Sequence, residues 1–124
     1  MDKLEQITKT PPEELVVERN HDADLEFRGW LLCTERASDW SGDRWTEIDL
    51  FRTVGGKLIV GVRQGSSTRG TMRQAGGVCE NGEEVVEWLR EDGKGRFGPA
   101  SKGLVRKAST LYPSLVRLPS ERIE

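Results

Sequence analysis

A pair of glycines, Gly55-Gly56, lies between two segments in which apolar and polar residues alternate, and it constrains the fold more than any other feature. Residues 44–53 precede the pair and residues 57–64 follow it. Alternation with a period of two is typical of strands with one buried face, and glycines at such a junction predict a tight β-hairpin. The chain is therefore expected to build an antiparallel sheet around this hairpin.

The length of the hairpin loop decides which side chains share a face of the sheet. A two-residue loop would mix acidic residues with the core. A three-residue loop, residues 54–56, pairs Thr53 with Lys57 and lets Gly56 adopt a positive φ angle. We prefer this second register because one face then carries only aliphatic side chains. They are Ile48, Leu50, Leu58, Val60 and Val62.

A further strand is predicted over residues 25–36. The turn-forming residues 38–43 separate it from the strand at 44–53. If this first hairpin places Leu31 beside Ile48, three more side chains join the aliphatic face. They are Phe27, Leu31 and Cys33.

The other face of this sheet is predicted to be partly aromatic. Phe51 lies opposite Ile59 there, and Glu47 meets Arg63 as a pair of unlike charges. An antiparallel sheet of this size normally exposes one face to water, so several aromatic rings on that face predict a covering element or a partner. The other residues assigned to this face are Arg28, Trp30, Leu32, Trp45 and Asp49.

The segment after the third strand is basic and rich in small residues. We interpret residues 65–77 as a flexible loop, with a fourth, short strand at 71–79 as the alternative. Helices are predicted at 82–92, where Asn81 suits the N-cap position, and at 101–112. The sequence therefore predicts an α+β fold, in which a three- to four-stranded antiparallel meander is followed by two helices.

The first 20 residues are predicted to lie outside the main domain. Residues 1–20 form a partly mobile N-terminal segment, and residues 21–124 form a single α+β domain. Within the first segment, Pro11-Pro12 followed by two glutamates suits the start of a helix, whereas Leu15-Val16-Val17 suits a strand equally well. We expect no signal peptide, a cytoplasmic location and no membrane partner, because no apolar run approaches the ~20 residues of a spanning helix.

The formal net charge of −2 conceals four blocks of alternating sign. Residues 1–49 carry 13 acidic and 6 basic side chains, and residues 80–92 carry six acidic side chains and one basic. Residues 50–79 carry five basic side chains and no acidic one, and residues 93–124 carry seven basic and two acidic. The overall balance argues against a general DNA-coating protein, whereas the separated blocks predict either internal ion pairs or a two-faced surface.

Few residues suit catalysis or cofactor binding. The only histidine, His21, lies in a polar connector, and Cys33 and Cys79 are far apart with no CxxC motif. We predict no catalytic residue, no metal site and no cofactor. The two cysteines are interpreted as buried and reduced, with a disulfide left open as the alternative.

The aromatic face and the neighbouring basic segment are the candidate partner-binding surface. Tryptophan and arginine are the residue types that dominate the binding energy of many protein interfaces. The residues assigned to this surface are Arg28, Trp30, Trp45, Phe51, Arg63, Arg69 and Arg73. A second group, Lys94, Arg96 and Lys102, lies around a glycine-rich segment and is a candidate anion site, with an ordinary linker as the alternative.

These features predict a non-enzymatic small binding protein that acts on a protein or nucleoprotein partner, or a homodimer that buries the same face. Bacterial or phage accessory proteins, including inhibitors, are similar in general type. One alternative is a protein that binds RNA or single-stranded DNA through the arginines and aromatic rings. Another is a small metal-dependent enzyme that uses the acidic residues Glu35, Asp39, Asp43 and Glu47.

Overall fold

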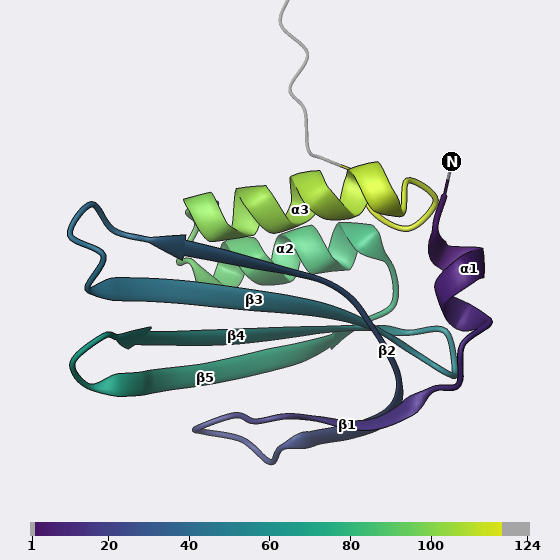
Figure 1. Ribbon diagram of the computed structural model, residues 1–124, viewed down its shortest axis with the longest axis horizontal. Helices are drawn as coiled ribbons and strands as arrows, with labels where there is room; N and C mark the ends of the chain where they lie inside the picture. Colours follow the sequence, from purple (N-terminus) through teal and green to yellow (C-terminus); the bar gives the residue numbers. More distant parts are fainter. Residues whose placement is uncertain (1, 118–124) are drawn as a thin grey trace, which may run out of the picture.

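A curled antiparallel sheet and two helices on one of its faces make up most of the computed structural model, which describes residues 2–117 (Figure 1). The five strands lie side by side in chain order: β1 (Glu13–Val17), β2 (Leu25–Ser38), β3 (Arg44–Thr53), β4 (Leu58–Ser66) and β5 (Gly70–Cys79). The helices are α1 (Leu4–Thr8) before the sheet, and α2 (Gly82–Asp92) and α3 (Pro99–Leu111) after it. None of the helices within this described range is long and apolar enough to cross a membrane.

The predicted α+β class with an antiparallel sheet is confirmed, but the sheet has five strands rather than three or four. The additional strand is β1, at the residues that suit a helix start and a strand equally well. Its partner is β2, with Leu15 opposite Phe27. The domain boundary predicted at residue 21 therefore falls inside the β1–β2 hairpin, and β1 is part of the same sheet.

The register predicted for the β3–β4 hairpin is confirmed. Phe51 pairs with Ile59, and the Thr53 amide donates to the Lys57 carbonyl oxygen at 2.9 Å. Gly56 has a φ angle of 91°, in the region that favours glycine. The aliphatic side chains of this hairpin consequently share one face, which lies beneath the helices.

The prediction for β2 is wrong at three positions, Phe27, Leu31 and Leu32, because this strand contains an irregularity. The register shifts between Leu31 and Cys33. Leu31 pairs with Phe51 and Cys33 pairs with Leu50, so Leu31 does not lie beside Ile48 as predicted. Leu32 and Cys33 both enter the core under the helices, whereas Leu31 is 46% exposed. Phe27, which precedes the shift, lies on the opposite face with Phe51.

Residues 65–77 form an ordered hairpin rather than a flexible loop. The turn lies between β4 and β5, and Gly70 begins β5 with a φ angle of 72°. The Ser67 amide donates to the Asp43 carbonyl oxygen at 2.7 Å, which ties this turn to the β2–β3 turn. The alternative of a further strand at 71–79 is therefore the correct one.

The main core lies between the sheet and helices α2 and α3. Asn81 accepts a hydrogen bond from the Glu84 amide at 3.0 Å, and α2 covers the predicted range of 82–92. α3 packs on β2 and β3, and α2 packs on β4 and β5. The largest side chains with almost no exposed surface in this core are Ile48, Leu50, Leu58, Leu89 and Leu104.

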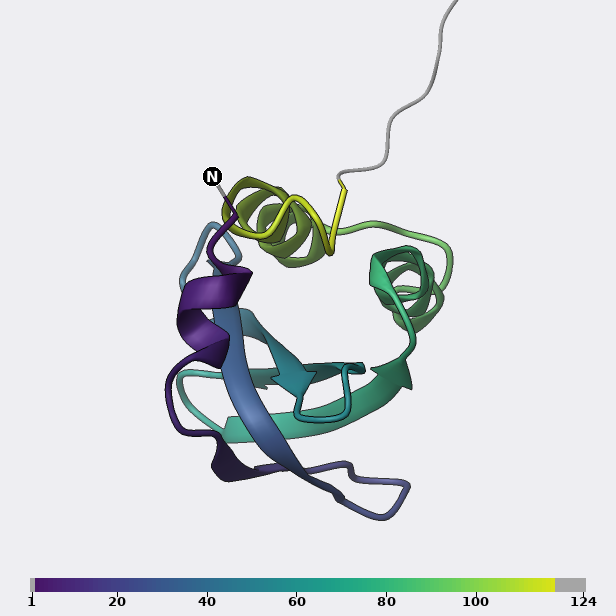
Figure 2. The ribbon, with the colours of Figure 1, turned by 90° about the vertical axis from the view of Figure 1, so that its right-hand side faces the viewer.

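A second, smaller cluster lies on the other face of the sheet, because the strongly curled β2 carries β1 underneath β3 and β4 (Figure 2). Val17 of β1 lies against Gly61 and Gly76, where a Cβ atom would come within 3.2 Å and 2.6 Å of its Cγ1 atom. The buried members of this cluster are Val17, Phe51 and Ile59, with Leu15, Leu25 and Phe27 packed around them. Glycines at the crossing points allow the close approach of the two layers.

Cys33 and Cys79 are both free and buried, as predicted. Burial raises the pKa of each thiol from 9.0 to about 11. At pH 8 the thiolate population is then about 100-fold lower than for an unperturbed cysteine. We expect both thiols of the folded protein to react with iodoacetamide at least that much more slowly than those of the urea-unfolded chain, measured by mass spectrometry. Fast alkylation of either thiol in the folded protein would contradict this assignment.

Candidate functional site

The sheet face opposite the helices is divided into a covered and an uncovered half. In the covered half, Phe51 is only 7% exposed, and its ring meets Phe27 edge-on at a centroid distance of 5.2 Å. The expectation that Phe51 lies on an open aromatic face is therefore wrong. The covering element is the β1–β2 hairpin of the same chain, whose first strand is predicted from sequence to lie outside the main domain.

Two other residues assigned to partner binding lie away from the uncovered half. The Trp30 indole Nε1 donates to the Thr10 carbonyl oxygen at 2.9 Å, so its polar atom is engaged by the segment that leads into β1. Arg28 is exposed on β2, where it pairs with Glu14 of β1. The structure therefore does not bring Trp30, Arg28 and Phe51 together with the remaining candidates.

The uncovered half carries Trp45 and Arg63. Arg36 lies against the Trp45 ring, and Glu47 forms ion pairs with both Arg36 and Arg63. The Arg36 guanidinium lies 4.6 Å from the centroid of the Trp45 ring, a cation–π arrangement, and 3.5 Å from the Glu47 carboxylate. Arg63 also forms an ion pair with Glu47 and lies 3.9 Å from Asp49. The predicted pairing of Glu47 with Arg63 is confirmed, and the same ion pairs neutralise much of the local charge.

Trp40 is the most exposed large apolar side chain of the described residues, at 98%. It lies in the β2–β3 turn, which is held together by its own polar side chains. The Ser41 hydroxyl donates to Asp39 at 2.7 Å, and Gly42 has a φ angle of 76°. These hydrogen bonds also lower the pKa of the Asp39 carboxyl group, with the Ser41 hydroxyl as the largest cause.

Trp40 is absent from the candidates that the sequence suggests, although one signal points to it. A tryptophan flanked by Ser, Asp and Gly in a turn cluster has no core position available to it. The alternation of apolar and polar residues marks the strands on either side and does not extend to this turn.

Further exposed residues lie at the same end of the sheet as Trp40, on the two turns that the Ser67–Asp43 hydrogen bond joins and on the adjoining strand ends. Arg44 begins β3, Arg69 lies in the β4–β5 turn, and Met72 of β5 is 50% exposed. Neither arginine has a carboxylate within ion-pair distance among residues 2–117. We call this region, Arg36, Trp40, Arg44, Trp45, Arg69 and Met72, the strand-turn surface.

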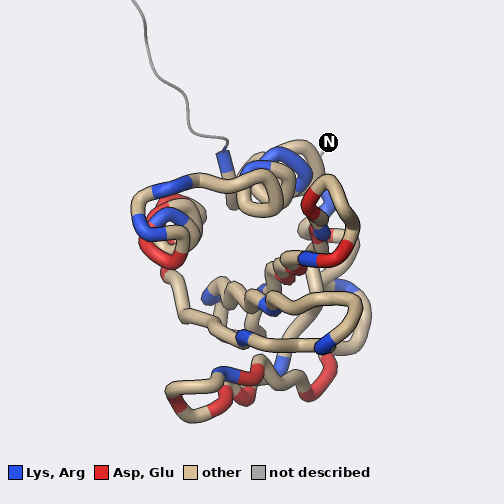
Figure 3. Tube along the Cα trace, turned by 90° about the vertical axis from the view of Figure 1, so that its left-hand side faces the viewer, with Lys and Arg blue, Asp and Glu red and all other residues tan. Residues whose placement is uncertain are grey.

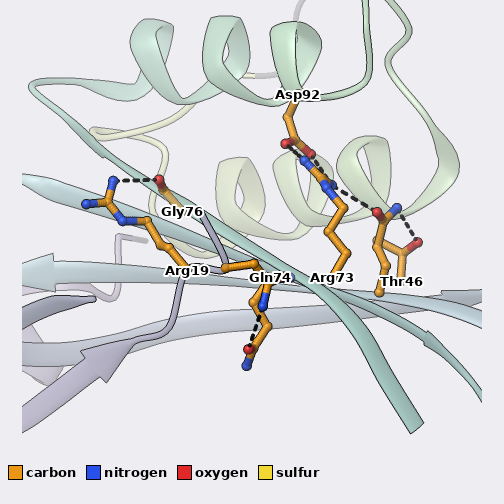
Figure 4. A network of polar contacts seen from close by, with 8 residues as sticks. Arg19, Thr46, Arg73, Gln74, Gly76 and Asp92 are labelled. Carbon is orange, nitrogen blue, oxygen red and sulfur yellow. Dashed lines mark hydrogen bonds and ion pairs between the residues drawn. The ribbon is translucent and has the colours of Figure 1, made fainter. Parts of the chain in front are cut away.

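Arg73 is held on the helix-facing side of the sheet, where it points toward α2 (Figure 4). Its guanidinium forms an ion pair with Asp92 of α2 and donates to Gln64 at 2.9 Å. The Asp92 carboxylate holds the pKa of the Arg73 guanidinium above its usual value. Gln64 in turn donates to the Thr46 hydroxyl at 3.3 Å. Arg73 thus joins the sheet to the end of α2.

The predicted anion group lies at the same end of the molecule. Lys94 and Arg96 are exposed in the α2–α3 loop, and Lys102 is exposed in the first part of α3. In Figure 1 this loop lies at the same end of the molecule as the β2–β3 and β4–β5 turns. Figure 3 looks onto that end and shows the loop on the α2 side, across from the β2–β3 turn. The anion-binding role of these three residues stays a prediction.

The four carboxylates proposed for a metal-dependent enzyme do not converge. Glu35 faces α3, where Lys107 lies 3.8 Å away, whereas Glu47 lies on the opposite face with Arg63. Asp39 and Asp43 are engaged in the hydrogen bonds of the adjoining turns. Residues 2–117 contain no group of three or more His, Cys, Asp or Glu side chains that could hold a metal ion.

The candidate site is therefore the strand-turn surface. This end combines an exposed indole with arginines that have no ion pair among the described residues, on two turns that are hydrogen-bonded to each other. Comparison of the chain with known protein families, with curated proteins and with solved structures finds no match.

Proposed function

We propose that the protein is a non-enzymatic binding protein that contacts an acidic segment of a partner protein through the strand-turn surface. The observation that carries this proposal is the nearly complete exposure of Trp40 on an ordered turn. Burying an indole removes roughly 150–250 Å² from water, which is worth about 4–6 kcal/mol before the costs of association. A tryptophan on a rigid support is a common anchor of protein interfaces.

The charges around Trp40 favour an acidic partner. Arg44 lies at the end of the turn that carries Trp40, and Arg69 lies in the adjoining turn. Neither has an ion pair among the described residues, so both guanidinium groups are available to carboxylates of a partner. The Asp39 and Asp43 carboxylates of the same turn would repel anionic groups of either kind. A phosphate backbone carries a charge at every nucleotide and would bring phosphates close to them, whereas a protein segment can place carboxylates at Arg44 and Arg69 alone and apolar residues elsewhere. For this reason we favour an acidic protein segment over RNA or single-stranded DNA.

Selection of peptides from a random library tests this proposal and requires no candidate partner. A phage-displayed library, selected on the immobilised protein, is expected to enrich sequences that combine Asp or Glu with apolar residues. Trp40→Ala should weaken the binding of a selected synthetic peptide by about 30-fold or more, as expected for the loss of an interface anchor. The measurement is fluorescence anisotropy of the labelled peptide.

The control variant is Leu31→Ala, which removes an exposed apolar side chain from the middle of β2 and should leave the affinity unchanged. Equal binding by Trp40→Ala and the original protein would refute the proposal. Labelled dT20 and U20 serve as the other arm of the test. Tight binding of either oligonucleotide that weakens steeply with salt and is lost in Arg69→Ala would replace the proposal with nucleic-acid binding.

A further inference from the structure

A cleft of about 470 Å³ opens between the ends of the strands and the first turn of α3. The sheet contributes the ends of β2, β3, β4 and β5, and α3 contributes Pro99 and Ala100. Its volume lies within the range of roughly 300–1,000 Å³ that is typical of small-molecule sites. The cleft shares Arg44, Trp45 and Met72 with the strand-turn surface, and it extends from there between the sheet and α3.

The walls of this cleft are largely apolar. The apolar lining residues include Ala37 of β2, Met72 of β5, and Pro99 and Ala100 of α3. Ala37 and Ala100 also pack against the main core, so the cleft ends on well-packed side chains. Such walls suit an aliphatic or aromatic body rather than a bare inorganic ion.

The polar groups of the cleft are mainly hydrogen-bond donors. Gln64 uses one amide hydrogen on Thr46 and its oxygen on Arg73, which leaves the other amide hydrogen for a ligand. The Arg44 guanidinium at the opening has no ion pair or side-chain hydrogen bond within residues 2–117. Arg73, also in the lining, is already paired with Asp92.

Asp39 is the one carboxylate of the lining among the described residues, and hydrogen bonds hold it within its own turn. It accepts from the Ser41 hydroxyl at 2.7 Å and from the Arg44 amide at 3.4 Å. The Arg44 side chain is not within ion-pair distance of it. Within the described chain, the cleft thus presents one unpaired cation, surplus donors and apolar walls.

We infer that this cleft is a binding site for a small organic carboxylate, with the carboxylate at Arg44 and an aliphatic or aromatic body between Met72 and the first turn of α3. A carboxylate supplies the acceptors that Arg44 and Gln64 lack, and charge-assisted hydrogen bonds of this kind are the stronger ones in proteins. The site shares Arg44 and Met72 with the strand-turn surface, but it does not require Trp40 or Arg69. Trp40→Ala therefore tests the partner interaction without removing a residue of the cleft.

Titration with phenylacetate and with its neutral counterpart phenylacetamide tests the site in the full chain. Amide chemical shifts of the ¹⁵N-labelled protein are expected to change at residues 37–46 and 64–73 and at Ala100. Phenylacetate should bind about tenfold or more tightly than phenylacetamide, and Arg44→Gln should abolish that difference. Sodium sulfate at the same concentration should not displace phenylacetate, because it lacks the apolar body.

The matched control is Arg28→Gln, which removes another exposed arginine, from β2 outside the cleft, and should keep the preference for the acid. Both arginines are exposed, so both variants are expected to fold, and the dispersion of the same spectra verifies this. Three results would each overturn the inference: no shift at the cleft with either compound, equal affinity for the two compounds, or an unchanged preference in Arg44→Gln.

Discussion

Replacing Phe51 with alanine is expected to lower the free energy of unfolding by about 3–5 kcal/mol, as for other large-to-small substitutions in protein cores. Phe51 is only 7% exposed and belongs to the cluster with Val17 and Ile59. The truncation would remove its edge-on contact with Phe27 and leave a cavity between the two layers of the curled sheet. Urea unfolding followed by far-ultraviolet circular dichroism measures the change.

The matched control is Trp40→Ala, which removes a larger aromatic side chain that is 98% exposed. Its effect on the free energy of unfolding is expected to stay within about 0.5 kcal/mol, since surface substitutions seldom exceed that. If Phe51→Ala were equally harmless, the second cluster would not contribute to stability, and the open aromatic face that the sequence predicts around Phe51 would be restored as a candidate docking surface.

Replacing Gly29 with alanine is expected to destabilise the protein by about 3 kcal/mol or more, although it adds a single methyl group. Gly29 pairs with Glu13 of β1 on one side and with Thr53 of β3 on the other. A Cβ atom there would collide with the carbonyl oxygen of Arg52 and lie 2.9 Å from the Thr53 Cα atom. These are backbone atoms, so the strands themselves would have to separate.

The control for this substitution is Gly55→Ala in the β3–β4 turn. A Cβ atom at Gly55 would have the Thr53 hydroxyl as its nearest neighbour, at an ordinary distance of 3.8 Å. We expect a change within about 0.5 kcal/mol, measured by the same urea unfolding. Equal stability of the two variants would mean that β2 can move away from β3 at this point without loss, contrary to the close approach described here.

The hairpin between β3 and β4 could be predicted because its information is local. A three-residue loop with glycine at the position of positive φ leaves one register in which every aliphatic side chain faces the same way. The helix at 82–92 was predictable for a similar reason, since Asn81 caps it and the apolar period is clear.

β2 and β1 were less predictable because their positions depend on distant partners. Nothing near Leu31 signals the register shift that exposes Leu31 and buries both Leu32 and Cys33. The five residues of β1 suit a helix start as well as a strand, and pairing with β2 decides between them. A short strand with weak propensity takes its conformation from the sheet it joins.

In the candidate site, too, the features set by local sequence could be predicted and those set by distant segments could not. Trp45 and Arg63 could be assigned correctly to one sheet face, because alternation along β3 and β4 determines it. Phe51 follows the same alternation, yet it is buried because β1 crosses beneath that part of the face. Trp40 could not be singled out in the same way, because exposure in a turn is apparent only when the neighbouring turns are seen in place.

The amino-acid sequence by itself determined the fold class, the β3–β4 register, the α2 boundaries and the buried state of both cysteines, because short-range periodicity, capping and turn chemistry govern these features. Only the tertiary structure decided which half of the outer face is covered, which carboxylate pairs with Arg73, and whether a cleft forms at Arg44. The physical reason is that each of these depends on contacts between segments far apart in the chain, brought together by the curl of β2 and the placement of the helices.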